Sequence, residues 1–136
     1  MTFKFKGEIY FISLFRSKRF YALKKYLKNK SLNVKIMRAL SVKNPKFNIQ
    51  KSLFSYIKYK KFHSGMFPTD REIACSISHL NAIRKSDFNK GLVICEDDAR
   101  LLINEKLFTN ILGSIEKISD YDIVLLGFSK SDYETE

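Results

Sequence analysis

Four short apolar blocks along this chain have the composition that is typical of β-strands. They are rich in β-branched and aromatic residues. The blocks are Glu8–Leu14, Asn33–Ala39, Gly91–Cys95 and Tyr121–Gly127. Because stretches with helical spacing lie between them, the sequence predicts an α/β fold with a mostly parallel sheet flanked by helices.

Apolar residues recur at helical spacing in three stretches, and each predicts an amphipathic helix. The stretches are Ser17–Lys30, a helix that starts at Thr69, and Asn104–Ile118. Thr69 and Glu72 have the spacing of a capping box, which fixes the start of the second helix. The predicted inward side chains are Ile73, Ile77, Leu80 and Ile83 in the second helix, and Phe108, Ile111, Leu112, Ile115 and Ile118 in the third.

Leu40–Pro68 is long, basic and aromatic, and Pro45 interrupts it. We expect a loop here, with one short helix near Ser52–Tyr59. A loop of this length within a compact domain is usually functional or mobile.

The 136 residues suffice for one hydrophobic core, so we expect a single domain. The chain has no apolar stretch of about 18 residues, which argues against a transmembrane helix, and no signal cleavage site is expected. Its two cysteines form no disulfide or zinc pattern, as is usual in a reducing cytoplasm.

The net charge of +11 is unevenly distributed along the chain. Met1–His63 carries 17 Lys and Arg against one acid, for a net charge of +16, and the remainder carries −5. The basic half indicates an anionic partner, which could be a nucleic acid, a phosphate-bearing substrate or a membrane surface.

Three acids, Glu96, Asp97 and Asp98, follow the third predicted strand directly. Strand alternation predicts that Glu96 and Asp98 share a face and that Asp97 points the opposite way. Two carboxylates at a strand end suit Mg²⁺ or Mn²⁺. The alternative is a polar strand end with its acids in solvent, which is the commoner outcome for an isolated acidic triplet.

The helix after Thr69 presents Cys75, Ser78, His79 and Ala82 opposite its predicted apolar stripe. Cys75 and His79 could form a metal pair. Ser78 and His79 point about 100° apart on a helix, so they cannot form a nucleophile–base pair by themselves. The residues alone favour a small-residue stripe that packs on the sheet, with a hydrogen-bonded histidine.

Taken in order, the segments "SLFRSKRF", "EIACSISHLNAIRK" and "LVICEDDA" resemble glycosyltransferase family 25, and the resemblance runs from Ile9 to Gly127. It implies a GT-A-like, Rossmann-type fold and a single family domain over residues 1–136. Family domains extend further, so this domain would be the N-terminal, nucleotide-sugar-binding portion, incomplete at its C-terminal end. The chain has Phe15, Arg71 and Ala74 where the family usually has Asp, Gly and Gly.

The resemblance also implies a function: metal-dependent transfer of a hexose, galactose from UDP-galactose, to a lipid-linked oligosaccharide in lipopolysaccharide biosynthesis, with Mn²⁺ or Mg²⁺ as the cofactor. It places the chain in the cytoplasm, with peripheral contact at the inner face of the membrane. It implies donor binding by Leu14, Arg16, Arg19 and Asp97, a metal on Glu96 and Asp98, and motif residues near the site at Glu72, Cys75, Ser78 and His79. No residue is singled out as the catalytic base.

The sequence also allows other functions. A shortened family member could keep the fold without the activity. A basic nucleic-acid-binding module is the main alternative, because Phe and Tyr are interleaved with Lys in "KSLFSYIKYKKFHSGMF". A Mg²⁺-dependent phosphohydrolase built on Asp97 and Asp98 is a third hypothesis.

Overall fold

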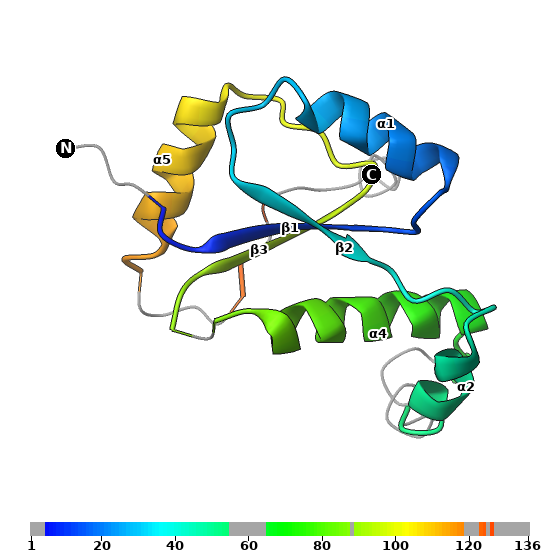
Figure 1. Cartoon of the computed structure of the whole chain (residues 1–136). Coiled ribbons are helices and arrows are strands. Elements are labelled where there is room, and N and C mark those ends of the chain that lie inside the picture. Colours follow the sequence, from blue (N-terminus) through cyan, green and yellow to red (C-terminus); the bar gives the residue numbers. More distant parts are fainter. Residues whose placement is uncertain (1–4, 55–64, 88, 119–122, 125, 127–136) are drawn as a thin grey trace, which may run out of the picture.

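A computed structural model describes residues 5–54, 65–87, 89–118, 123, 124 and 126. Within these residues, three parallel strands form a sheet in the order β2-β1-β3 (Figure 1). The strands are β1 (Glu8–Ser13), β2 (Val34–Arg38) and β3 (Leu92–Glu96). The predicted α/β class, with a parallel sheet flanked by helices, is confirmed.

The central strand, β1, is buried on both faces. Ile9 and Phe11 pack on one side of the sheet, and Tyr10 and Ile12 pack on the other. This alternation explains why β1 is apolar at successive positions, because each face of a central parallel strand is covered by helices.

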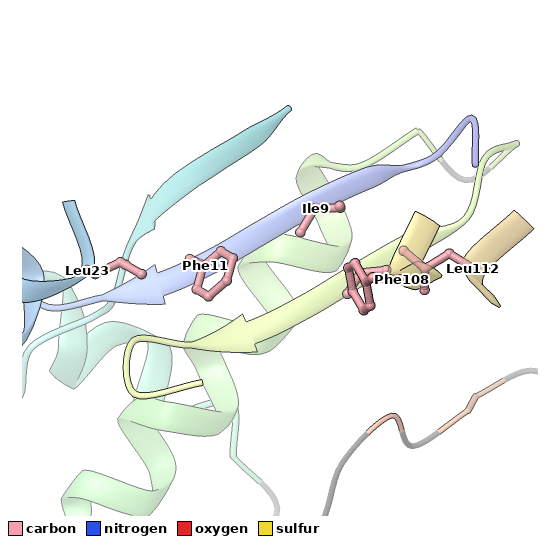
Figure 2. Close-up of a cluster of buried hydrophobic side chains, with 6 residues drawn as sticks. Ile9, Phe11, Leu23, Phe108 and Leu112 are labelled. Atoms are coloured by element: carbon pink, nitrogen blue, oxygen red, sulfur yellow. The ribbon is translucent and has the colours of Figure 1, made fainter. Parts of the chain in front are cut away.

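Two helices, α1 (Lys18–Leu27) and α5 (Glu105–Ile115), cover one face of the sheet (Figure 1). Figure 2 shows the core that they form with β1 and β3. Leu23 of α1 is fully buried there, and Phe108 and Leu112 of α5 are buried at 9% and 3% exposure. Ser17 and Asn104 cap these helices by accepting hydrogen bonds from the backbone N–H groups of Phe20 and Leu107.

The opposite face is covered by α4 (Asp70–Lys85), and α2 (Pro45–Lys51) packs against α4 in turn (Figure 1). The predicted capping box at the start of α4 is confirmed, with Thr69 and Glu72 exchanging both hydrogen bonds. Ala82 contacts Tyr10 and Ile12 of the sheet. Among the described residues, no helix is both apolar and long enough to span a bilayer.

The predicted inward stripe of α4 is partly wrong. Ile73 and Ile77 are buried, but Leu80 is 49% exposed and Ile83 is 37% exposed. Two members of the predicted small-residue stripe, Ser78 and Ala82, are buried instead, because small side chains let the helix approach the sheet closely, whereas Cys75 of the same stripe is exposed. The buried residues of this helix are Ile73, Ala74, Ile77, Ser78 and Ala82.

The predicted inward face of α5 needs a similar correction. Phe108 and Leu112 are buried, whereas Ile111 is 40% exposed. Ile118 is 48% exposed because it lies beyond the end of the helix at Ile115.

The short helix expected near Ser52–Tyr59 lies earlier in the chain. Asn44 accepts a hydrogen bond from the backbone N–H of Lys46, and Pro45 occupies the first turn, so α2 begins at Pro45 and ends at Lys51. Residues 55–59 lie outside the described residues. The predicted fourth strand, Tyr121–Gly127, also falls mostly outside them, and its described residues are not in a strand.

The revised face of α4 predicts unequal costs for two similar truncations. We expect Ile73→Ala to lower the free energy of unfolding by about 2–5 kcal/mol, because Ile73 is fully buried. Leu80→Ala should change it by less than about 1 kcal/mol, since half of that side chain is already in water. Urea denaturation followed by circular dichroism measures both, and equal losses would contradict the assignment.

Candidate functional site

The site lies where the carboxyl ends of β1 and β3 meet. From β1, the chain crosses one face of the sheet through α1 to reach β2, and it later crosses the other face through α4 to reach β3. In open α/β sheets, ligands bind at such a reversal of strand order. A cavity of about 510 Å³ opens here, and its lining comes from the β1–α1 turn, the loop after β2, α4 and the end of β3.

A buried hydrogen bond joins the two strands at this edge. Ser13, the last residue of β1, donates from Oγ to Oδ2 of Asp97 at 2.7 Å. Both residues are buried, Ser13 at 1% exposure and Asp97 at 9%. The Asp97 carboxylate is therefore held in one position although it lies in a turn.

Arg19 balances two of the three acids. Its guanidinium Nη1 lies 3.5 Å from Oδ1 of Asp97 and 3.4 Å from Oδ2 of Asp98. The Arg19 side chain is 67% exposed, so these ion pairs contribute little to stability. They do place one positive charge between two carboxylates that would otherwise repel each other.

The turn that carries the chain from β1 to α1 is tightly folded. Arg16 has a φ of 65°, a left-handed conformation that is uncommon for a residue with a side chain. Ser17 then caps α1, so the positive N-terminal end of this helix borders the cavity. Leu14 and Ser17 line the cavity, and Arg16 is exposed beside it.

The third acid, Glu96, faces α4 instead. Leu92 and Ile94 lie on the α4 side of the sheet, and strand alternation puts Glu96 on the same side. Oε1 of Glu96 lies 3.7 Å from Sγ of Cys75 and 3.9 Å from Nε2 of His79. One potential ligand atom from each of these three residues can be chosen so that all lie within 4.8 Å of one another.

Two of the predicted motif residues on α4 have structural contacts. Glu72 closes the capping box, accepting from the backbone N–H of Thr69 at 2.7 Å. Ser78 Oγ donates to the carbonyl of Ala74 at 2.7 Å and accepts from the backbone N–H of Leu40 at 2.8 Å. Ser78 therefore ties α4 to the loop after β2. Among the described residues, the Ser78 hydroxyl forms no hydrogen bond with His79, whose Nδ1 lies beside the carbonyl of Cys75 instead.

Burial raises the pKa of both thiols in the described structure. For Cys75 the second cause is the negative charge of Glu96, which disfavours a thiolate beside it. For Cys95, on the opposite face of the sheet from α4, burial alone raises the pKa to about 11. Both cysteines are consequently neutral thiols near pH 7.

The structure divides the predicted site residues into two groups. Arg19 contacts both Asp97 and Asp98 on the α1 side, where Arg19 and Asp97 line the cavity. Glu96 lies with Cys75 and His79 on the α4 side. Glu96 and Asp97 do lie on opposite sides, but the prediction that Glu96 and Asp98 share a face is wrong. Because β3 ends at Glu96, Asp97 and Asp98 both lie in the following turn, and strand alternation does not extend to either.

Sequence reasoning missed several residues of the cavity. Ser13 follows the apolar run Ile9–Ile12 directly, and a polar residue at that end of a buried strand could have been predicted to belong to the site. Lys43 and Arg71 also line the cavity and bring positive charge from the loop after β2 and from the first turn of α4. Nothing in their local pattern distinguishes them from other surface cations.

Comparison with known proteins gives one match. A profile of the family described as Glycosyltransferase family 25 (LPS biosynthesis protein) matches residues 6–136. A search of curated proteins found no match. A search of solved structures also found none.

The buried bond between the strand ends predicts a measurable loss on truncation. We expect Ser13→Ala to lower the free energy of unfolding by about 1–3 kcal/mol, because it removes a donor from a largely buried carboxylate. Ser114→Ala is the control. The Ser114 hydroxyl is exposed and donates only to the carbonyl of Asn110, one turn earlier in α5, so its removal should change the free energy of unfolding by less than about 0.5 kcal/mol. Thermal and urea unfolding report both values, and a neutral Ser13→Ala would show that the bond contributes nothing.

Proposed function

The chain belongs to glycosyltransferase family 25, the LPS biosynthesis glycosyltransferases, and we propose that it transfers galactose from UDP-galactose to a lipid-linked oligosaccharide. Family membership gives it a sugar donor and an acceptor as partners in general terms. The particular donor, the acceptor and a requirement for Mn²⁺ or Mg²⁺ belong to the proposal.

The family match over residues 6–136 is the observation that carries this proposal. It favours a transferase over the nucleic-acid-binding module that the basic N-terminal half also allowed. The position of the cavity agrees with it, because the carboxyl edge of a parallel sheet is where α/β proteins bind nucleotides. On this basis the fold corresponds to the nucleotide-binding part of a GT-A-like domain.

Donor binding is assigned to the cavity as a whole. Arg19, Lys43 and Arg71 line it from three different elements and supply positive charge for a diphosphate. Asp97, held by Ser13, is a fixed acceptor for a ribose or hexose hydroxyl. Leu14 and Arg16 complete the predicted donor set at the turn before α1.

The metal requirement is assigned to Glu96 and Asp98. Carboxylate oxygens of this kind suit Mg²⁺ or Mn²⁺, and both side chains are exposed. Glu96 lies on the α4 side and Asp98 on the α1 side, so a shared ion requires the two side chains to turn toward each other. When bound, such an ion supplies positive charge that offsets the charge of the departing nucleoside diphosphate. Arg19 already provides part of that charge beside Asp97 and Asp98.

The proposed reaction breaks the bond between the anomeric carbon of the hexose and the diphosphate oxygen. An acceptor hydroxyl forms the new bond to that carbon and loses its proton to a base, through an oxocarbenium-like transition state. The residues of this chain bind and orient the donor and stabilise the leaving diphosphate. The net charge of +16 over Met1–His63 favours encounter with an anionic donor and with an acceptor at the inner face of an anionic membrane.

Calorimetric titration with UDP-galactose, with and without Mn²⁺, tests the proposal. We expect binding by the wild-type chain that depends on Mn²⁺, and about a 10- to 100-fold loss in Asp98→Asn, as is typical when a metal site loses a supporting group. The matched control is Asp87→Asn, an exposed acid that pairs with Lys90 in the turn before β3, and its binding should equal that of the wild type.

Two results would contradict the proposal. One is a folded wild-type chain that binds no UDP-sugar in the presence of Mn²⁺. The other is equal binding by wild type and Asp98→Asn. Parallel titrations with UDP-glucose test the choice of sugar. If the chain is specific for galactose, it should bind UDP-glucose more weakly than UDP-galactose.

A further inference from the structure

Three side chains of different chemistry converge on the α4 side of the cavity. Cys75 and His79 lie one helical turn apart on α4, so they project from the same face of the helix. Glu96, the last residue of β3, reaches the same point from the sheet. All three residues line the cavity.

The spacing of their ligand atoms is close to what a zinc ion needs. Oε1 of Glu96 lies 3.7 Å from Sγ of Cys75 and 3.9 Å from Nε2 of His79, and one ligand atom from each of the three residues can be chosen so that all lie within 4.8 Å of one another. Ligands about 2.0–2.3 Å from a tetrahedral zinc ion lie roughly 3.3–3.7 Å from one another. Small side-chain rotations would therefore bring the three groups to bonding distance.

The orientation of His79 supports the same conclusion. Its Nδ1 lies 3.0 Å from the carbonyl oxygen of Cys75. A carbonyl can only accept, so Nδ1 carries the proton and donates, which leaves the lone pair of a neutral ring on Nε2. Metal-binding histidines are commonly held in this way, with the second ring nitrogen bonded to a backbone carbonyl.

The elements that carry the three groups are firmly packed. The capping box fixes the start of α4, and Ala74, Ser78 and Ala82 are buried along the helix. Glu96 continues a strand that is paired with β1 over its whole length. Ligands on a helix and a strand are held more precisely than ligands on loops.

We propose that Cys75, His79 and Glu96 form a binding site for a zinc-like transition-metal ion, with the fourth ligand position facing the cavity. A thiolate and an imidazole select Zn²⁺ over the hard ions Mg²⁺ and Mn²⁺. Binding forms a zinc–sulfur bond and releases the thiol proton to solvent. Three protein ligands with one position left for water or a substrate group are typical of catalytic zinc sites.

This site does not depend on the proposed transfer reaction. It shares Glu96 with the proposed Mn²⁺ pair, so the two proposals are separated by the residues that they do not share. Those residues are Cys75 and His79 for the zinc-like ion, and Asp98 for the hard ion.

The test is titration of the metal-free chain with Co²⁺, followed by displacement with Zn²⁺. We expect one ion per chain and a thiolate-to-cobalt absorption band that Zn²⁺ abolishes. Cys75→Ser should remove the band and weaken Zn²⁺ binding, measured by competition with a chromophoric chelator, by at least about 10- to 100-fold. Cys95→Ser is the matched control, because that thiol lies on the other face of the sheet, and it should keep both the band and the affinity.

His79→Gln and Asp98→Asn complete the design. Loss of affinity in His79→Gln with retention in Asp98→Asn supports the assignment, whatever UDP-galactose titration shows. A wild-type chain without a thiolate band would overturn it. So would a band that survives Cys75→Ser and is lost in Cys95→Ser. Circular dichroism of each variant confirms that it is folded, and the exposure of Cys75 makes misfolding of Cys75→Ser unexpected.

Discussion

The burial of β1 on both faces and both edges is the constraint on which the rest of the structure depends. Ile9 to Ser13 are all buried, and β2 and β3 pair with the strand in parallel. Because parallel strands cannot be joined by a hairpin, the chain must cross the sheet to form each pair. It crosses one face through α1 and the other through α4, and it leaves the carboxyl end of β1 as the place where polar groups gather.

At that end, the sheet separates three consecutive acids into two chemical environments. Glu96 lies on the face covered by α4, where it contacts a thiol and an imidazole. Asp97 and Asp98 lie toward α1, where Ser13 and Arg19 contact them. Strand alternation fixes the side of Glu96, the last residue of β3, whereas Asp97 lies in the following turn and is held on the other side by Ser13. One short acidic segment can thus supply ligands of two kinds to one cavity.

Strand positions and helix starts could be predicted from the sequence, because they follow from local patterns. β1 contains the continuous apolar run Ile9–Ile12, and Thr69 with Glu72 marks the start of α4 without any tertiary information. The buried face of α4 could be predicted only in part, since the sequence offered both an apolar stripe with Leu80 and a small-residue stripe with Ser78, and no local pattern decides between them. In the structure Ser78 is buried and Leu80 is half exposed, because the smaller side chain allows α4 to pack more closely on the rest of the protein. The contact between Cys75 and Glu96 likewise depends on a pairing 21 residues apart, which no local period encodes.

The hydroxyl of Ser78 links parts of the molecule that lie 38 residues apart in the sequence. It accepts from the backbone of Leu40 and donates to the carbonyl of Ala74, so it clamps the loop after β2 onto the turn of α4 that carries Cys75 and His79. Leu40, Ser41 and Lys43 of that loop line the cavity together with this helix. The two walls consequently behave as one mechanical unit. A ligand that displaces the loop must also break the hydrogen bond between Leu40 and Ser78 or move α4 away from the sheet. The packing of α4 in the protein core therefore makes this side of the cavity rigid.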